Sequence, residues 1–76
     1  MGVVKLPELG EGIEKATVVS WYRKEGESVK EDDDIVELVT DKATFNVSAP
    51  TSGIVTKIFF QEGEEAVVGA TLAVID

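Results

Sequence analysis

The chain has 76 residues, of which 43% are hydrophobic, and its formal net charge at neutral pH is −8. This length allows one small domain, near the lower limit for a core that folds without a covalent or metal staple. The chain contains no Cys and no His, so neither a disulfide nor a typical zinc site is available. The negative charge argues against nucleic acid and anionic membranes as partners, because binding to phosphates requires Lys and Arg.

Short runs of β-branched and apolar residues alternate with turn-forming residues along the whole chain. No segment shows a helical period with a cap, and no apolar run approaches the length of a membrane span. The predicted strands are residues 3–6, 16–23, 28–30, 35–39, 44–48, 54–60, 66–68 and 71–75. We therefore predict an all-β domain of about eight short strands.

The two halves of the chain repeat each other. The motif Glu-Gly-Glu occurs at 25–27 and again at 62–64, which is 37 residues later. The run 4–7 matches 47–50 at a separation of 43 residues, so six extra residues lie in the loop after Pro7. Each half alone would leave an apolar face in water, so the two must pack together. We expect a pseudo-two-fold flattened barrel or sandwich of two four-stranded antiparallel sheets, a barrel-sandwich hybrid.

Lys42 stands at the tip of a predicted β-hairpin. The four residues Thr40-Asp41-Lys42-Ala43 join two predicted strands, and Asp41 suits a turn because its short side chain can bond to nearby backbone. The hairpin joins one repeat to the next, and the equivalent place after the second repeat is the C-terminus. We therefore expect the tip at one end of the domain and the termini at the other. A lysine exposed in this way is accessible to a modifying enzyme, and we predict that Lys42 carries the functional group.

Two stretches are similar to the lipoyl domains of dihydrolipoamide acyltransferases, which belong to 2-oxo acid dehydrogenase complexes. One is Leu-Pro-Glu-Leu-Gly-Glu-Gly-Ile at 6–13, and the other is Glu-Leu-Val-Thr-Asp-Lys-Ala at 37–43. The resemblance also includes Trp21, Gly26 and Gly53, and extends over essentially the whole chain. It identifies residues 1–76 as a single lipoyl (biotinyl/lipoyl-like) carrier domain, which we expect to be cut from a longer multidomain acyltransferase chain.

The resemblance implies lipoic acid in amide linkage to Lys42, flanked by Asp41 and Ala43 and attached by a lipoylating enzyme. A thiamine-diphosphate 2-oxo acid dehydrogenase would acylate the arm reductively, the acyltransferase core would pass the acyl group to coenzyme A, and a flavin-dependent dihydrolipoamide dehydrogenase would reoxidise the dithiol. With neither His nor Cys, the usual acyl-transfer nucleophiles and bases are absent, so the domain alone is not expected to be a catalyst. We expect a monomer, in bacterial or archaeal cytoplasm or in the mitochondrial matrix of a eukaryote.

The loop after Pro7 is the predicted recognition element. A symmetric sandwich does not need its six extra residues, and functional contacts are often carried on loops. Leu9 and Ile13 are expected to anchor the loop, with its acids in water near the arm. The residues predicted for partner recognition are Glu8, Leu9, Gly10, Glu11, Gly12, Ile13, Glu14 and Val39.

Alternation along the strands predicts which side chains face water. Glu37 is costly to bury unpaired, so Glu37 and Val39 should lie on the exposed face. Many family members carry a polar or acidic residue at the position of Val39, three before the lysine, so this position departs from the family pattern. Trp21 is expected in the core, on a buried face shared with Thr17 and Val19.

Two other functions remain as alternatives. A biotin carrier domain has a similar fold and also presents a hairpin lysine, but that lysine is usually flanked by Met, and here Asp41 and Ala43 flank it. An unmodified barrel-sandwich structural module would not need a lysine at the tip.

The acidic run 31–34 lacks the spacing of a calcium-binding loop, so a solvated turn is expected there. For the 2-oxo acid, the opening loop suggests pyruvate or a branched-chain acid, whereas residues 14–18 favour 2-oxoglutarate.

Overall fold

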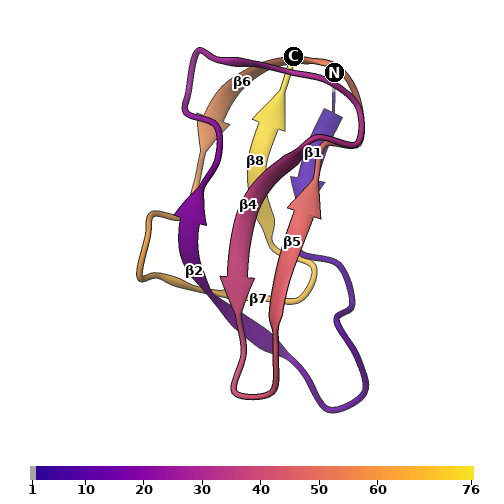
Figure 1. The fold of residues 1–76 in the computed structure, drawn as a ribbon, viewed down its shortest axis with the longest axis vertical. Helices are drawn as coiled ribbons and strands as arrows, with labels where there is room; N and C mark the ends of the chain where they lie inside the picture. The colour runs from indigo at the N-terminus through magenta and orange to yellow at the C-terminus, as the bar shows by residue number, and fades with distance from the viewer. Residues whose placement is uncertain (1) are drawn as a thin grey trace.

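Two four-stranded antiparallel sheets face each other in the computed structural model, which describes residues 2–76 (Figure 1). The first sheet has the order β1 (Gly2–Lys5), β8 (Thr71–Ile75), β6 (Gly53–Ile58) and β3 (Ser28–Val29). The second has the order β5 (Thr44–Ser48), β4 (Asp34–Val39), β2 (Lys15–Trp21) and β7 (Glu65–Val67). The predicted fold class is confirmed, and the predicted strand bounds differ from the observed ones by two residues at most.

An apolar core fills the space between the sheets. Its largest fully buried side chains come from both sheets and from the segment after β1: Leu6, Ile35, Leu38, Leu72 and Ile75. Burial of each such side chain contributes about 1.5–3 kcal/mol. Among residues 2–76 no polar or charged residue is buried. The domain therefore depends on one apolar core, and each of the two sheets around it contains strands from both halves of the chain.

Backbone hydrogen bonds confirm the repeat. The Gly26 N–H donates to the Val55 carbonyl at 2.7 Å. At the equivalent place, 37 residues later, the Gly63 N–H donates to the Val18 carbonyl at 2.8 Å. The turn of each half is thus bonded to a strand of the other half, and neither half satisfies its own backbone groups alone.

The acidic run 31–34 forms a turn with an unusual backbone conformation. Asp32 has φ +74°, and it is the one non-glycine residue with positive φ among residues 2–76. Its counterpart in the second half is Gly69, with φ +91°. The Asp32 N–H donates to the Ala49 carbonyl at 2.9 Å, as the Gly69 N–H does to the Leu6 carbonyl at 2.8 Å. Asp32 therefore occupies a positive-φ turn position that is held by a glycine in the second half.

The surroundings predicted for Trp21 are wrong. The pairing of β2 with β4 is irregular after Val18, where a bulge breaks the alternation of side chains between the two faces. Up to the bulge the alternation is regular: Val18 is buried, Thr17 is half-buried and Val19 is 42% exposed, so Thr17 and Val19 lie on the outer face and only the shift after Val18 turns Trp21 toward the core. Trp21 itself packs against the core, as expected, and its indole N–H donates to the Phe60 carbonyl at 2.8 Å.

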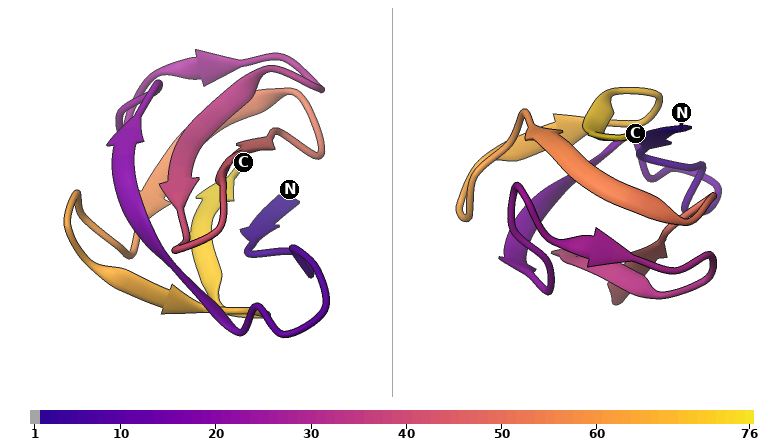
Figure 2. Two further views of the ribbon diagram at one scale, coloured as in Figure 1. Left: turned by 60° about the horizontal axis from the view of Figure 1, so that its bottom comes forward. Right: turned by 90° about the horizontal axis from the view of Figure 1, so that it is seen from above.

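The chain termini and the hairpin between β4 and β5 lie at opposite ends of the long axis (Figure 1). The molecule extends 32 Å along this axis and 20 × 16 Å across it. Figure 2 shows the two sheets curving around the core when seen from each end. The prediction that the hairpin tip and the termini lie at opposite ends is confirmed.

Within residues 2–76 there is no helix long and apolar enough to cross a membrane, and no cluster of acidic side chains placed to hold a metal ion.

The two equivalent turn glycines provide a test of the repeat. Gly26 has φ +92° and Gly63 has φ +89°, and a Cβ at either place would meet no atom within 4 Å. The cost of a side chain there comes from the backbone conformation and not from a clash. Replacing either glycine with Val should lower the free energy of unfolding by about 1–3 kcal/mol in urea denaturation. Replacement with Asn, which tolerates positive φ, is the control and should cost less. Unchanged midpoints in both Val variants would contradict the argument.

Candidate functional site

Lys42 lies in a four-residue turn that is built directly on paired strands. The last pair of the β4–β5 ladder is Val39 with Thr44. One step further, the Thr40 N–H donates to the Ala43 carbonyl at 2.8 Å and closes the turn. The lysine at its tip is exposed. The side chain of Lys42 therefore leaves from a root that the sheet holds in place.

The Thr40 hydroxyl organises this turn. It accepts hydrogen bonds from the Lys42 N–H at 3.2 Å and the Ala43 N–H at 3.1 Å, and it lies 3.2 Å from the Ala43 carbonyl, to which it donates. Sequence reasoning gave the turn-forming role to Asp41, but within residues 2–76 the Asp41 side chain makes no hydrogen bond. A hydroxyl residue at the first position of a short turn is the sequence signal that would have identified Thr40.

The amine of Lys42 has the surroundings that a covalent modification needs. Within the described part of the chain it has no carboxylate partner within 4.0 Å, so acylation of the amine would break no ion pair. The backbone of the recognition loop passes close by: a Cβ at Gly12 would lie 4.0 Å from the Lys42 Nζ. Gly12 has φ +81°, which a residue with a side chain rarely adopts.

The loop between β1 and β2 lies beside the hairpin, at the same end of the domain (Figure 1). A recess of about 400 Å³ separates the two segments. The loop contributes Gly12, Ile13 and Glu14 to its lining, and the hairpin contributes Thr40 and Asp41. The arrangement inferred from the repeat is therefore present, and any protein that reaches Lys42 meets this loop as well.

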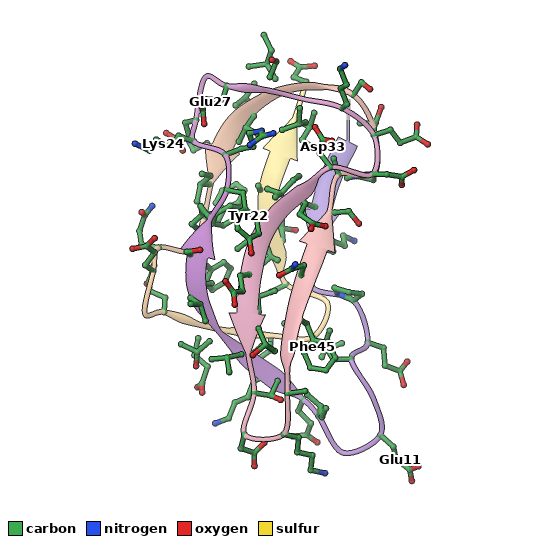
Figure 3. All side chains as sticks on the ribbon, in the orientation of Figure 1. Glu11, Tyr22, Lys24, Glu27, Asp33 and Phe45 are labelled. Carbon is green, nitrogen blue, oxygen red and sulfur yellow. The ribbon has the colours of Figure 1, made fainter. Side chains whose placement is uncertain are left out.

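The loop is tied to the domain at several points. Leu9 packs against the core, and Ile13 is half-buried. The Ile13 N–H donates to the Gly10 carbonyl at 3.2 Å, and the Val68 N–H donates to the Glu14 carbonyl at 2.9 Å. The three carboxylates of the loop are exposed: Glu8, Glu11 and Glu14. Figure 3 shows Glu11 extending into solvent at the hairpin end.

Val39 is less accessible than the sequence predicts. It is half-buried at the end of β4, between Thr17 and Thr44 on the neighbouring strands. Glu37 is half-buried on the same face, and its Oε1 lies 3.3 Å from the hydroxyl of Tyr22, which donates to it. Desolvation and the Glu37 carboxylate raise the pKa of Tyr22 above its ordinary value, so at neutral pH the phenol is a protonated donor. Alternation assigned both residues to the correct face, but their neighbours cover most of the surface of each.

Comparison with known proteins identifies the family. The biotin/lipoyl family model, described as biotin-requiring enzyme, matches residues 2–75. The solution structure of the lipoyl domain of the 2-oxoglutarate dehydrogenase complex from Azotobacter vinelandii is 35% identical, with a TM-score of 0.78 over 97% of this chain and 94% of that one. This chain is a lipoyl domain. Lipoyl domains carry covalently attached lipoic acid, and such a domain is a carrier and not itself a catalyst.

Curated relatives of the lipoyl domain are components of two kinds of complex. The acetyltransferase component of the pyruvate dehydrogenase complex of Staphylococcus aureus is 39% identical over 72 residues. The succinyltransferase component of the 2-oxoglutarate dehydrogenase complex of Rickettsia conorii is 42% identical over 71 residues. The lipoyl domain spans 17% and 18% of their lengths. A urea carboxylase from Kluyveromyces lactis, 21% identical with a TM-score of 0.83 over 99% of this chain and 6% of that one, shares the fold.

The role of the Thr40 hydroxyl can be tested by replacing it. Thr40→Val keeps the branched shape but leaves two amides at the tip without their acceptor, which should cost about 0.5–1.5 kcal/mol. Amide hydrogen exchange at Lys42 and Ala43, followed by NMR, should accelerate by up to about tenfold. Thr40→Ser retains the hydroxyl and is the matched control. Exchange rates unchanged by Val, or raised equally by Ser, would show that the strands alone hold the tip.

Proposed function

We propose that lipoic acid is attached in amide linkage to the Nζ of Lys42. The observation that carries this proposal is an exposed amine at a turn that is built on paired strands, in a chain that is a lipoyl domain. The other lysines lie in strands or in turns outside the hairpin: Lys5, Lys15, Lys24, Lys30 and Lys57. Amide formation removes one positive charge, so the net charge would change from −8 to −9.

The domain would act as a carrier of acyl groups. When bound, the lipoyl group supplies a dithiolane that takes up an acyl group on reduction and releases it to an acceptor thiol. The chain's own residues hold the root of the arm: Thr40 and the β4–β5 ladder fix the backbone, so motion is confined to the side chain beyond it. We propose that the domain presents the arm to a thiamine-diphosphate 2-oxo acid dehydrogenase, to an acyltransferase core that serves coenzyme A, and to a dihydrolipoamide dehydrogenase.

The parent chain is proposed to be a dihydrolipoamide acyltransferase. The relatives that match are acyltransferase components of which this domain covers less than a fifth. Tethering a carrier to the enzyme that it serves raises its local concentration at the active site. We place the parent in bacterial or archaeal cytoplasm or in the mitochondrial matrix. Biotin is the less supported cargo, because Asp41 and Ala43 flank the lysine and the urea carboxylase shares the fold at only 21% identity.

Lys42 should be the single site of lipoylation. Treatment of the domain with a lipoate ligase, lipoate and ATP should add one lipoyl group by intact mass, and peptide mapping should place it at Lys42. Lys42→Arg keeps the positive charge, removes the acceptor amine and should abolish the modification. Biotin and a biotin ligase in a parallel reaction test the other cargo. Labelling of Lys42→Arg, or biotinylation in place of lipoylation, would refute the assignment.

The recognition loop is proposed to be read by the 2-oxo acid dehydrogenase. It lies beside the hairpin, its backbone approaches Lys42 at Gly12, and its three acids are exposed. The contacts that tie it to the core involve mainly Leu9 and the loop ends. The loop therefore presents a fixed acidic surface to any enzyme that receives the arm.

Shortening residues 8–14 to a four-residue turn tests this role. Ligase modification of Lys42 should persist, with some loss of stability from the Leu9 contact. The rate of reductive acylation should fall at least about tenfold, the equivalent of about 1.4 kcal/mol.

A matched variant, Glu8→Gln with Glu11→Gln and Glu14→Gln, keeps the loop and its anchors. If the acids steer the encounter, this variant should lose the salt dependence of the wild-type reaction. If the shortened domain is reductively acylated at the wild-type rate, the loop has no role in recognition. If the shortened domain fails to fold, the loop has a structural role instead.

A further inference from the structure

The recess beside Lys42 is bounded by segments that are far apart in the sequence. Its walls come from the loop after Pro7, the first residues of β2 and the tip of the hairpin (Figure 1). Its volume of about 400 Å³ lies within the range of about 300–1,000 Å³ that is typical of sites for small ligands. The recess depends on the longer of the two equivalent connections, so it belongs to the part of the chain in which the two halves differ.

The amine of Lys42 stands at the edge of this recess. Gly12 is part of the lining, and a Cβ on Gly12 would lie 4.0 Å from the Lys42 Nζ. Thr40 and Asp41, the two residues before the lysine, line the recess from the hairpin. A group attached to the Nζ therefore begins at the opening of the recess, and the absence of a side chain at Gly12 leaves space beside the atom of attachment.

The inner part of the lining is suited to an apolar group. Ile13 and Thr17 are half-buried, and Ala16, between the loop and the rest of β2, is buried. The Thr40 hydroxyl is already engaged with the backbone of the turn, so it needs no partner from a ligand. An apolar group that enters the recess would lose contact with water without leaving a polar group of the protein unpaired.

The rim of the recess is negatively charged. It carries three exposed carboxylates, on Glu14, Asp41 and Glu65, and one exposed amine, on Lys15. The Lys15 Nζ lies 3.5 Å from the Glu65 Oε1, so this amine already has a carboxylate partner. Like charges repel at short range, so the rim admits an uncharged group and disfavours an anion.

We propose that the recess is a resting site for the uncharged end of the lipoyl arm on its own domain. This inference rests on the proposed attachment of lipoic acid to Lys42. The dithiolane at the end of the arm is small, apolar and without charge, which matches both the inner lining and the acidic rim. Because one wall is the recognition loop, a partner that contacts this loop also meets the arm at rest.

The covalent attachment makes a weak site sufficient. A short flexible tether gives the attached group an effective concentration of about millimolar, so a contact that would not retain free lipoate is still populated. The charged residues of the rim are all exposed, so the recess opens to water and the arm can leave it for an active site. The site therefore restricts where the arm waits and does not prevent its transfer between enzymes.

Nuclear Overhauser contacts test the resting site directly. The domain is labelled with ¹³C, lipoylated with unlabelled lipoate, and checked for modification of Lys42 by mass. Ring protons of the arm should show contacts with the methyl groups of Ile13 and Thr17. They should show none with Val19, which lies on the same outer face of β2 but outside the recess.

A pair of matched variants fills or spares the recess. Thr17→Phe places a ring in the recess and should reduce the contacts between the arm and Ile13 at least about fivefold, because the resting state is less populated. Val19→Phe adds the same ring two residues further along the strand and should leave these contacts unchanged. Undiminished contacts in Thr17→Phe, or an equal loss in Val19→Phe, would overturn the resting site.

The selection for an uncharged end can be tested without any substitution. The chain has no Cys, so after reduction the arm holds the only thiols that iodoacetamide or iodoacetate can alkylate. The two products are similar in size, but only iodoacetate adds carboxylates. The neutral product should keep its contacts with Ile13 and the charged product should lose them, and products that do not differ would overturn the selection. A domain that stays unmodified at Lys42 refutes the proposed function, whereas a lipoylated domain whose arm makes no contact with the recess refutes this inference alone.

Discussion

Each half of this domain is completed by the other half. The turn at Gly26 bonds to Val55 and the turn at Gly63 bonds to Val18, so backbone groups of one repeat are satisfied only across the interface. The core is shared in the same way, because each sheet draws strands from both repeats. In a chain of this length, one half cannot bury enough apolar surface to offset the conformational entropy that folding removes. The single interface between the halves is therefore the constraint on which the rest of the structure depends.

This constraint also explains how a small domain can present an exposed lysine on a rigid support. The hairpin that carries Lys42 connects the repeats, and its strands lie within a sheet whose inner face is fully covered by the core. The paired strands of that sheet hold the base of the hairpin, and hydrogen bonds to the Thr40 hydroxyl hold the backbone of the tip. A carrier benefits from this arrangement, since an arm attached to a fixed root explores space through its own side-chain bonds without deforming the domain.

The two halves differ in a loop that the fold does not require. A perfect repeat would not need the longer connection beside Lys42. That loop places exposed carboxylates at the end of the domain that presents Lys42. Positions at which the repeat is kept, such as the two turn glycines with positive φ, serve the fold. Comparison of the two halves thus separates residues that the fold requires from residues that it does not.

The sequence by itself determined the strands, the repeat, the turn glycines and the position of Lys42, because β-propensity, turn chemistry and a 37-residue spacing are all local or periodic signals. The sequence also placed the loop after Pro7 at the hairpin end, because the spacing of the repeated motifs indicated a two-fold relation between the halves. The surroundings of Trp21 and the partial burial of Val39 were decided only in the tertiary structure. A bulge after Val18 changes which side chains point inward, and cross-strand neighbours cover a residue that alternation alone exposes. The turn-forming role of Thr40 likewise arises from contacts between its hydroxyl and backbone groups that a linear pattern does not contain.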